Sequence, residues 1–204
     1  MSDNQTSPKS CDWLLLIGGS TYKFTLTGFY LVALVAILKN HGYSLNQLSW
    51  IHLIGGIEAA KVLFAALMER RPAGRFGRFR GWLLAATLGL SAVFGLMSCT
   101  DITQNFPLLL ACCVLLSAMS AVYGCAMLGL VMDKSDRATA ALDSSLQFSV
   151  VLLGSYAAGF AALRLAKAIG YTDAYWVAVY LAVLVGLLLY LNRNLFNYSD
   201  RDSQ

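Results

Sequence analysis

The stretch "FPLLLACCVLLSAMSAVYGCAMLGLVM", residues 106–132, decides the fold class because it contains no charged residue from one end to the other. A helix of about 20 apolar residues is long enough to cross the hydrocarbon core of a bilayer. A helix is also one of the few structures whose backbone hydrogen bonds are all satisfied there. The stretch therefore predicts a transmembrane helix.

Five further apolar runs of similar length accompany it, separated by short polar connections. The chain is 58% hydrophobic and 13% charged, with a mean hydropathy of +0.62, whereas soluble domains are about 45–50% apolar and about 25% charged. We expect an all-α integral membrane protein with six transmembrane helices, arranged as two three-helix units in one domain, residues 1–204. The six predicted spans are residues 13–38, 46–68, 80–98, 106–132, 140–163 and 173–193.

The distribution of basic residues predicts the orientation of these spans. If the N-terminus is cytoplasmic, ten lysines and arginines fall on the cytoplasmic side and three on the other, as the positive-inside rule requires. The ten are Lys9, Arg70, Arg71, Arg75, Arg78, Arg80, Lys134, Arg137, Arg193 and Arg201. We expect both termini in the cytoplasm, with the first apolar run kept as an anchor because no basic segment of a signal peptide precedes it.

Two charged residues are expected at the middle of the membrane. Lys23 lies ten residues past Trp13, about 15 Å into the bilayer at a rise of 1.5 Å per residue. Glu58 lies ten residues before Met68 on the returning span, and so at the same depth. A lone charge there costs at least about 2.5–3.5 kcal/mol, so we expect Lys23 and Glu58 to pair, either as a packed structural pair or in a polar cavity.

Lys61 lies three residues after Glu58 on the same helical face, nearer the cytoplasm. Asp143 and Gln147, one turn apart at the start of the fifth run, are the partners that the sequence predicts for it. In the alternative interpretation, Lys61 and Asp143 extend to the interface with their charged ends in water.

Several function classes have no support in the sequence. There is no nucleophile elbow, HExxH, P-loop or pair of catalytic carboxylates, so no enzyme is predicted. The five cysteines show neither CxxC nor zinc spacing, and no cofactor or metal is predicted. The basic residues lie in short loops between spans, an arrangement that does not indicate binding of nucleic acid.

The connection "ALMERRPAGRFGRFRGW", residues 66–82, resembles the loop that marks the major facilitator superfamily. In that family the loop caps helix ends and helps to latch the inward- and outward-facing states. The family's leading Gly and Asp are displaced here, and Met68 and Glu69 stand roughly where family members carry an Asp-Arg pair. The matching positions are Glu69, Arg70, Gly74, Arg75, Gly77, Arg78 and Arg80.

Two other stretches are similar to a subgroup of this family that includes siderophore permeases of the rhizobactin and pyochelin type and muropeptide permeases. "DWLLLIGGSTYKF", residues 12–24, resembles its seventh helix, with Tyr22–Lys23 in place. "GLVMDKSDRATAALDSSLQFSVVLLGSYAAGFAALRLAKAIGY", residues 129–171, resembles its tenth-to-eleventh helix connection. The resembling elements are Met132–Asp133, Arg137, Ala140, Asp143, Gln147 and a small-residue helix that ends at Gly170–Tyr171. The resemblance covers nearly the whole chain, but it matches only the second six-helix half of a facilitator.

The resemblance implies a half-length secondary transporter component for a small polar solute, with ferric siderophore uptake across the inner membrane, coupled to protons, as the first guess. Its partners would be the lipid bilayer and either a second copy of the chain or a separate first-half chain. Lys23, Glu58, Lys61, Asp143 and Gln147 would line the substrate and proton pathway. The alternative is a non-transporting partner subunit or a truncated remnant of a transporter.

Overall fold

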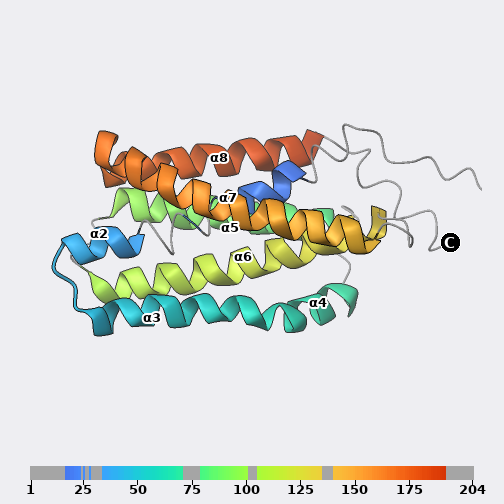
Figure 1. The fold of residues 1–204 in the computed structure, drawn as a ribbon, viewed down its shortest axis with the longest axis horizontal. Helices are drawn as coiled ribbons and strands as arrows, with labels where there is room; N and C mark the ends of the chain where they lie inside the picture. Colours follow the sequence, from blue (N-terminus) through green and yellow to red (C-terminus); the bar gives the residue numbers. More distant parts are fainter. Residues whose placement is uncertain are drawn as a thin grey trace, which may run out of the picture.

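The computed structural model describes residues 17–23, 25, 28, 34–70, 79–100, 105–134 and 140–191. Within these ranges every regular element is a helix, which confirms the all-α fold class (Figure 1). Residues 17–23, 25 and 28 are helical and belong to the first predicted span. The labelled elements are α2 (Leu34–Asn40), α3 (Leu45–Gly55), η2 (Gly56–Ala60), α4 (Lys61–Arg70), α5 (Arg80–Cys99), α6 (Phe106–Lys134), α7 (Ala140–Ile169) and α8 (Tyr171–Leu191).

A tight turn reverses the chain between the first and second predicted spans. Gly42 has φ +87°, a left-handed conformation that glycine adopts without steric cost. Ser44 then begins α3 with a capping box, because its hydroxyl accepts from the Gln47 N–H while the Gln47 side chain accepts from the Ser44 N–H. Local signals therefore set the turn between these two spans.

The second predicted span, 46–68, is not one regular α-helix. It consists of α3 and α4 joined end to end by the five-residue 3₁₀ helix η2, with Glu58 in its middle. A 3₁₀ turn inside a longer helix tightens the backbone and often marks a hinge or a functional position. The break therefore coincides with Glu58, the acid that the sequence analysis expects at mid-membrane.

Four helices are long and apolar enough to cross a membrane among the described residues: Arg80–Cys99, Phe106–Met132, Phe148–Ile169 and Asp173–Leu191. They correspond to the last four predicted spans, with the fifth extending to Ile169 rather than ending at residue 163. Neither α3 nor α4 is long enough to cross alone, at 11 and 10 residues. The first predicted span lies partly outside the described residues, so the count of six remains a prediction.

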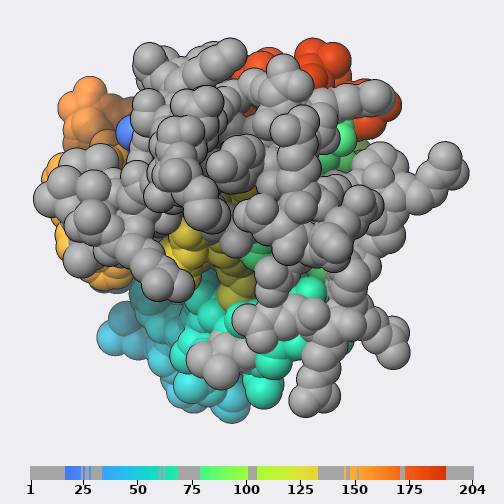
Figure 2. Space-filling view, turned by 90° about the vertical axis from the view of Figure 1, so that its right-hand side faces the viewer, coloured from blue at the N-terminus to red at the C-terminus, as the bar shows by residue number. Residues whose placement is uncertain are grey.

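Helix α6 lies at the centre of the bundle. It contacts α3, η2 and α4 on one side, and α5 and α7 on others, while α5 also packs along α8. Figure 1 shows α3 and α4 at one edge of the bundle and α8 at the opposite edge. In the end-on view of Figure 2, α6 in yellow is visible between α7 in orange and the α3–α4 span in cyan.

The outer helices present large apolar side chains to their surroundings. Only 18% of the apolar stretch of α7 is buried within the structure, against 50% for α6. Such a surface suits lipid contact, because lipid tails are as apolar as leucine. The exposed residues include Phe148, Leu152, Leu153, Tyr156 and Phe160 on α7, and Tyr180, Val183, Leu184, Leu187 and Leu191 on α8.

The first segment approaches α7 closely at a glycine. A Cβ atom added to Gly28 would collide with the backbone carbonyl of Ser155 and would lie 3.0 Å from the Gly159 nitrogen. Glycines of this kind let membrane helices pack backbone to backbone. Gly18, in the same segment, has open space around it.

Substituting Gly28→Ala should therefore destabilise the protein by about 1–3 kcal/mol, the usual cost of overpacking. Gly18→Ala is the matched control and should be neutral or slightly stabilising, because alanine favours a helix. The measurement is thermal unfolding of both variants in one detergent. Equal melting temperatures for the two would contradict the close approach to α7.

Candidate functional site

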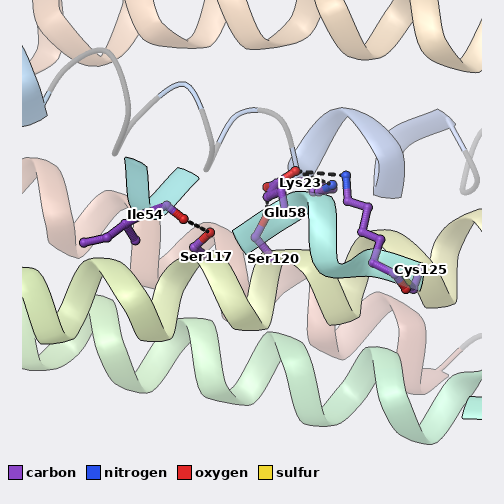
Figure 3. A network of polar contacts seen from close by, with 7 residues as sticks. Lys23, Ile54, Glu58, Ser117, Ser120 and Cys125 are labelled. Atoms are coloured by element: carbon purple, nitrogen blue, oxygen red, sulfur yellow. Dashed lines mark hydrogen bonds and ion pairs between the residues drawn. The ribbon is translucent and has the colours of Figure 1, made fainter. Parts of the chain in front are cut away.

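The centre of the candidate site is an ion pair between the first segment and η2. Lys23 Nζ lies 3.2 Å from Glu58 Oε2 and donates a hydrogen bond to it (Figure 3). Lys23 is 4% exposed, although it carries a full charge at the end of a long side chain. The pairing predicted from depth along the two antiparallel segments is confirmed.

A second lysine binds the same carboxylate oxygen. Lys61 Nζ lies 2.9 Å from Glu58 Oε2, across three residues of the same span. The Lys61 side chain is 38% exposed, against 5% for Lys23 and 18% for Glu58. Lys61 is thus the outer member of a three-residue charge cluster, Lys23–Glu58–Lys61.

Helix α6 supplies the polar contacts that hold this cluster. The Ser120 hydroxyl donates a 2.7 Å hydrogen bond to Glu58 Oε1, so both carboxylate oxygens have partners. Ser117 Oγ donates to the Ile54 carbonyl at 3.1 Å, and Cys125 Sγ donates to the Lys61 carbonyl at 3.2 Å. These two carbonyls stand on either side of η2, so α6 binds the broken span before, within and after the 3₁₀ segment.

Gly124 makes room for the lysine. A Cβ atom at this position of α6 would lie 2.5 Å from Lys23 Nζ, 3.0 Å from its Cε and 3.2 Å from its Cδ. The stem of Lys23 therefore runs over a surface that has no side chain. Because the Nζ atom is committed to Glu58, the lysine could not move aside without lengthening the ion pair.

The charges within the cluster do not cancel. Two ammonium groups and one carboxylate sum to +1 when all three are ionised. Inside an apolar bundle such a charge interacts strongly with neighbouring groups, since the effective dielectric constant is low. The arrangement can attract an anion, and it can also respond to protonation of its single carboxylate.

The other predicted pathway residues are only partly described. Asp143 and Gln147 lie on α7, near its beginning, but their side chains are outside the described part of the structure. Their predicted contact with Lys61 therefore stays a prediction. The partner that the structure does give Lys61 is Glu58, which shares its helical face.

Of the predicted conformational loop, Arg80 is the residue whose side chain is described. It is buried at the start of α5, where its guanidinium donates to the Tyr190 backbone carbonyl and lies 5.5 Å from the centre of the Tyr190 ring. This contact joins the beginning of α5 to the end of α8. Glu69 and Arg70 end α4 with side chains that are not described, and Gly74, Arg75, Gly77, Arg78 and Arg137 lie outside the described residues.

The sequence interpretation missed the contribution of α6. Ser117, Ser120 and Gly124 recur at intervals of three and four residues, which places them on one helical face. This small, partly polar stripe within the most apolar span was the available signal.

Among the described residues, no group of three His, Cys, Asp or Glu side chains could hold a metal ion.

No protein-family model matches this chain, and a search of the solved structures finds no match. The resemblance to the major facilitator superfamily therefore rests on the sequence motifs quoted above.

The shared carboxylate predicts unequal costs for removing its partners. Glu58→Leu leaves two buried ammonium groups facing each other and should cost about 3–5 kcal/mol, as does breaking a buried pair. Lys23→Met leaves the neutral Lys61–Glu58 pair, so it should cost about 1.5–3 kcal/mol, the range for a charged hydrogen bond. The measurement is unfolding in detergent, with the exposed Lys39→Met as control. A larger loss for Lys23→Met than for Glu58→Leu would contradict the shared carboxylate.

Proposed function

We propose that this chain forms one six-helix half of a secondary transporter of the major-facilitator type, moving a small polar solute across the inner membrane with proton coupling. The observation that carries the proposal is the buried Lys23–Glu58–Lys61 cluster. The facing half would come from a second copy or from a separate first-half chain. A ferric siderophore is the first solute to test, because the quoted stretches resemble siderophore permeases.

The free-energy cost of burying the charges of this cluster supports a transport role. Ionised groups inside membrane segments are costly, and they mark ion pathways and proton relays in transporters. Replacing a buried ionic group by packed apolar residues is often neutral or stabilising. A cluster that served packing alone could be replaced without loss, whereas a transport pathway needs its charges.

The interrupted second span gives further support. Transporter binding sites are commonly formed where a transmembrane helix is discontinuous near the midplane. Here the 3₁₀ segment Gly56–Ala60 carries Glu58, and the residues on either side of it are held by hydrogen bonds from α6. A change in the bonding of Glu58 would therefore act directly on the junction between α3 and α4.

The chemistry of coupling follows from the bonds of Glu58. A proton that adds to Oε2 would neutralise the carboxylate and remove the attraction that holds both ammonium groups at this oxygen. Lys23 and Lys61 would then be able to bind an anionic solute. Loss of the proton on the other side of the membrane would restore the cluster and release the solute.

Uptake should depend on the charge of Lys23. In cells producing this chain, alone and with candidate first-half chains, Lys23→Ala should abolish uptake of labelled ferric siderophore while the protein stays in the membrane. Lys39→Ala removes a lysine from an exposed site at the end of α2 and should leave uptake unchanged. Wild-type uptake by Lys23→Ala, at equal protein levels, would defeat the assignment.

Proton coupling makes a separate prediction for Glu58→Gln, which keeps the shape of the side chain but cannot lose a proton. This variant should lose accumulation driven by a pH gradient, and a protonophore should no longer affect it. It should retain exchange of solute down its gradient, because exchange requires no net proton movement. Gradient-driven accumulation by Glu58→Gln would remove the carboxylate from the coupling mechanism.

One observation favours a rival function, that of a non-transporting partner subunit. Both Glu58 oxygens have partners within the chain, as in a fixed structural core. In that case the double variant Lys23→Met/Glu58→Leu should preserve the phenotype that the gene supports. The transporter proposal requires the same double variant to be inactive, so one complementation experiment separates the two.

A further inference from the structure

Two tyrosines beside the charge cluster are buried with unsatisfied hydroxyl groups. Tyr22 is 3% exposed and Tyr123 is 0% exposed, and neither hydroxyl has a hydrogen-bond partner among the described residues. Their rings meet edge to face with centroids 5.6 Å apart. Tyr22 precedes Lys23 in the sequence, and Tyr123 precedes Gly124, over which Lys23 lies.

The position of the Tyr123 hydroxyl is set by a second glycine of the first segment. A Cβ atom on Gly19 would lie 3.2 Å from Tyr123 Oη and would collide with the methyl group of Met127. Gly19 and Lys23 are four residues apart, so they share one face of the helix about 6 Å apart along its axis. The Tyr123 hydroxyl thus lies within about one helical turn of the Lys23 backbone, between the first segment and α6.

Ring packing does not explain the two hydroxyl groups. A phenylalanine would make the same edge-to-face contact without burying a polar atom, and an unsatisfied buried hydroxyl is unfavourable. Buried polar groups that lack protein partners call for a specific explanation, and binding of another molecule is one of them. Two such groups in one ring pair, next to a buried cluster with an excess positive charge, favour this explanation.

The hydrogen-bond donors of Tyr22, Tyr123 and Lys23 indicate which chemical class of ligand could bind here. A tyrosine hydroxyl donates one hydrogen bond and a lysine ammonium donates up to three, without accepting any. Hydrogen bonds from such donors are strongest to ionised oxygen acceptors. The +1 charge of Lys23–Glu58–Lys61 also disfavours a cation, so the ligand that fits is an anionic group with oxygen acceptors, such as a carboxylate.

We propose that Tyr22, Tyr123 and Lys23 form a subsite for a carboxylate group of the transported solute, which makes that solute a small carboxylate-bearing anion. Each tyrosine hydroxyl donates one hydrogen bond to the carboxylate, and the Lys23 ammonium balances its charge. This inference rests on the proposed transport function, because it identifies the chemical class of that function's solute.

Citrate, a tricarboxylate, is the probe for a binding experiment with the full-length chain in lipid nanodiscs. Binding is measured by titration calorimetry at constant ionic strength, with spermidine as the cationic comparison. Tyr22→Phe and Tyr123→Phe should each weaken citrate binding by about tenfold, the effect of one hydrogen bond to a charged group. Tyr180→Phe, on the exposed face of α8, should leave binding unchanged.

A second measurement separates a ligand site from a structural role. Without citrate, Tyr22→Phe and Tyr123→Phe should melt at or above the wild-type temperature, because each removes an unsatisfied hydroxyl and keeps the ring. If both variants melt at lower temperature and bind citrate as the wild type does, the hydroxyls are bonded within the protein or to water, and the subsite is wrong. Failure of the wild type to bind citrate, or equal binding of spermidine, would also overturn it.

Parallel uptake assays distinguish failure of this subsite from failure of the transport proposal. Uptake that requires Lys23 but proceeds normally in both phenylalanine variants would overturn the subsite and leave the transporter standing. Citrate binding that is weakened by both phenylalanine substitutions, in a chain that supports no uptake with any partner, would support the subsite and count against transport.

Discussion

An ionised carboxylate inside an apolar bundle is the constraint on which the described structure depends. Glu58 requires positive partners close by, because neither lipid nor aliphatic side chains can solvate its charge. Lys23 arrives from the first segment and Lys61 from the same span, while Ser120 of α6 binds the remaining oxygen. Two parts of the chain that are distant in sequence, the first segment and α6, are thereby brought to one side chain of the second span.

The broken second span and the charge cluster depend on the same helix. Ser117, Ser120 and Cys125 of α6 bind the span before, within and after η2. Small residues at these positions allow the close approach that such short contacts need, and Gly124 extends the same surface beneath Lys23. Helix α6 therefore does more than occupy the centre of the bundle. Its hydrogen bonds stabilise an irregular backbone segment that would be costly in contact with lipid.

Sequence reasoning predicted the Lys23–Glu58 pair, but it did not predict that Lys61 binds the same carboxylate. Depth along a span follows from residue counting, because every helical residue adds a fixed rise. The partner that the structure gives Lys61 is Glu58, on the same helical face, while the sequence interpretation looked to Asp143 and Gln147. Nor did the pattern of residues 46–68 predict a 3₁₀ segment, because its hydrophobicity is continuous through Gly55 and Gly56.

The sequence by itself determined the membrane class, the approximate positions of the last four spans, and the need for a partner at Lys23. These properties follow from length, hydropathy and depth, which are one-dimensional and can be read along the chain. Only the tertiary structure decided which side chains meet at a given depth: Ser120 with Glu58, Gly124 with Lys23, and Tyr22 with Tyr123. Those contacts depend on the rotation of each helix about its axis, which is set by close packing between segments far apart in sequence.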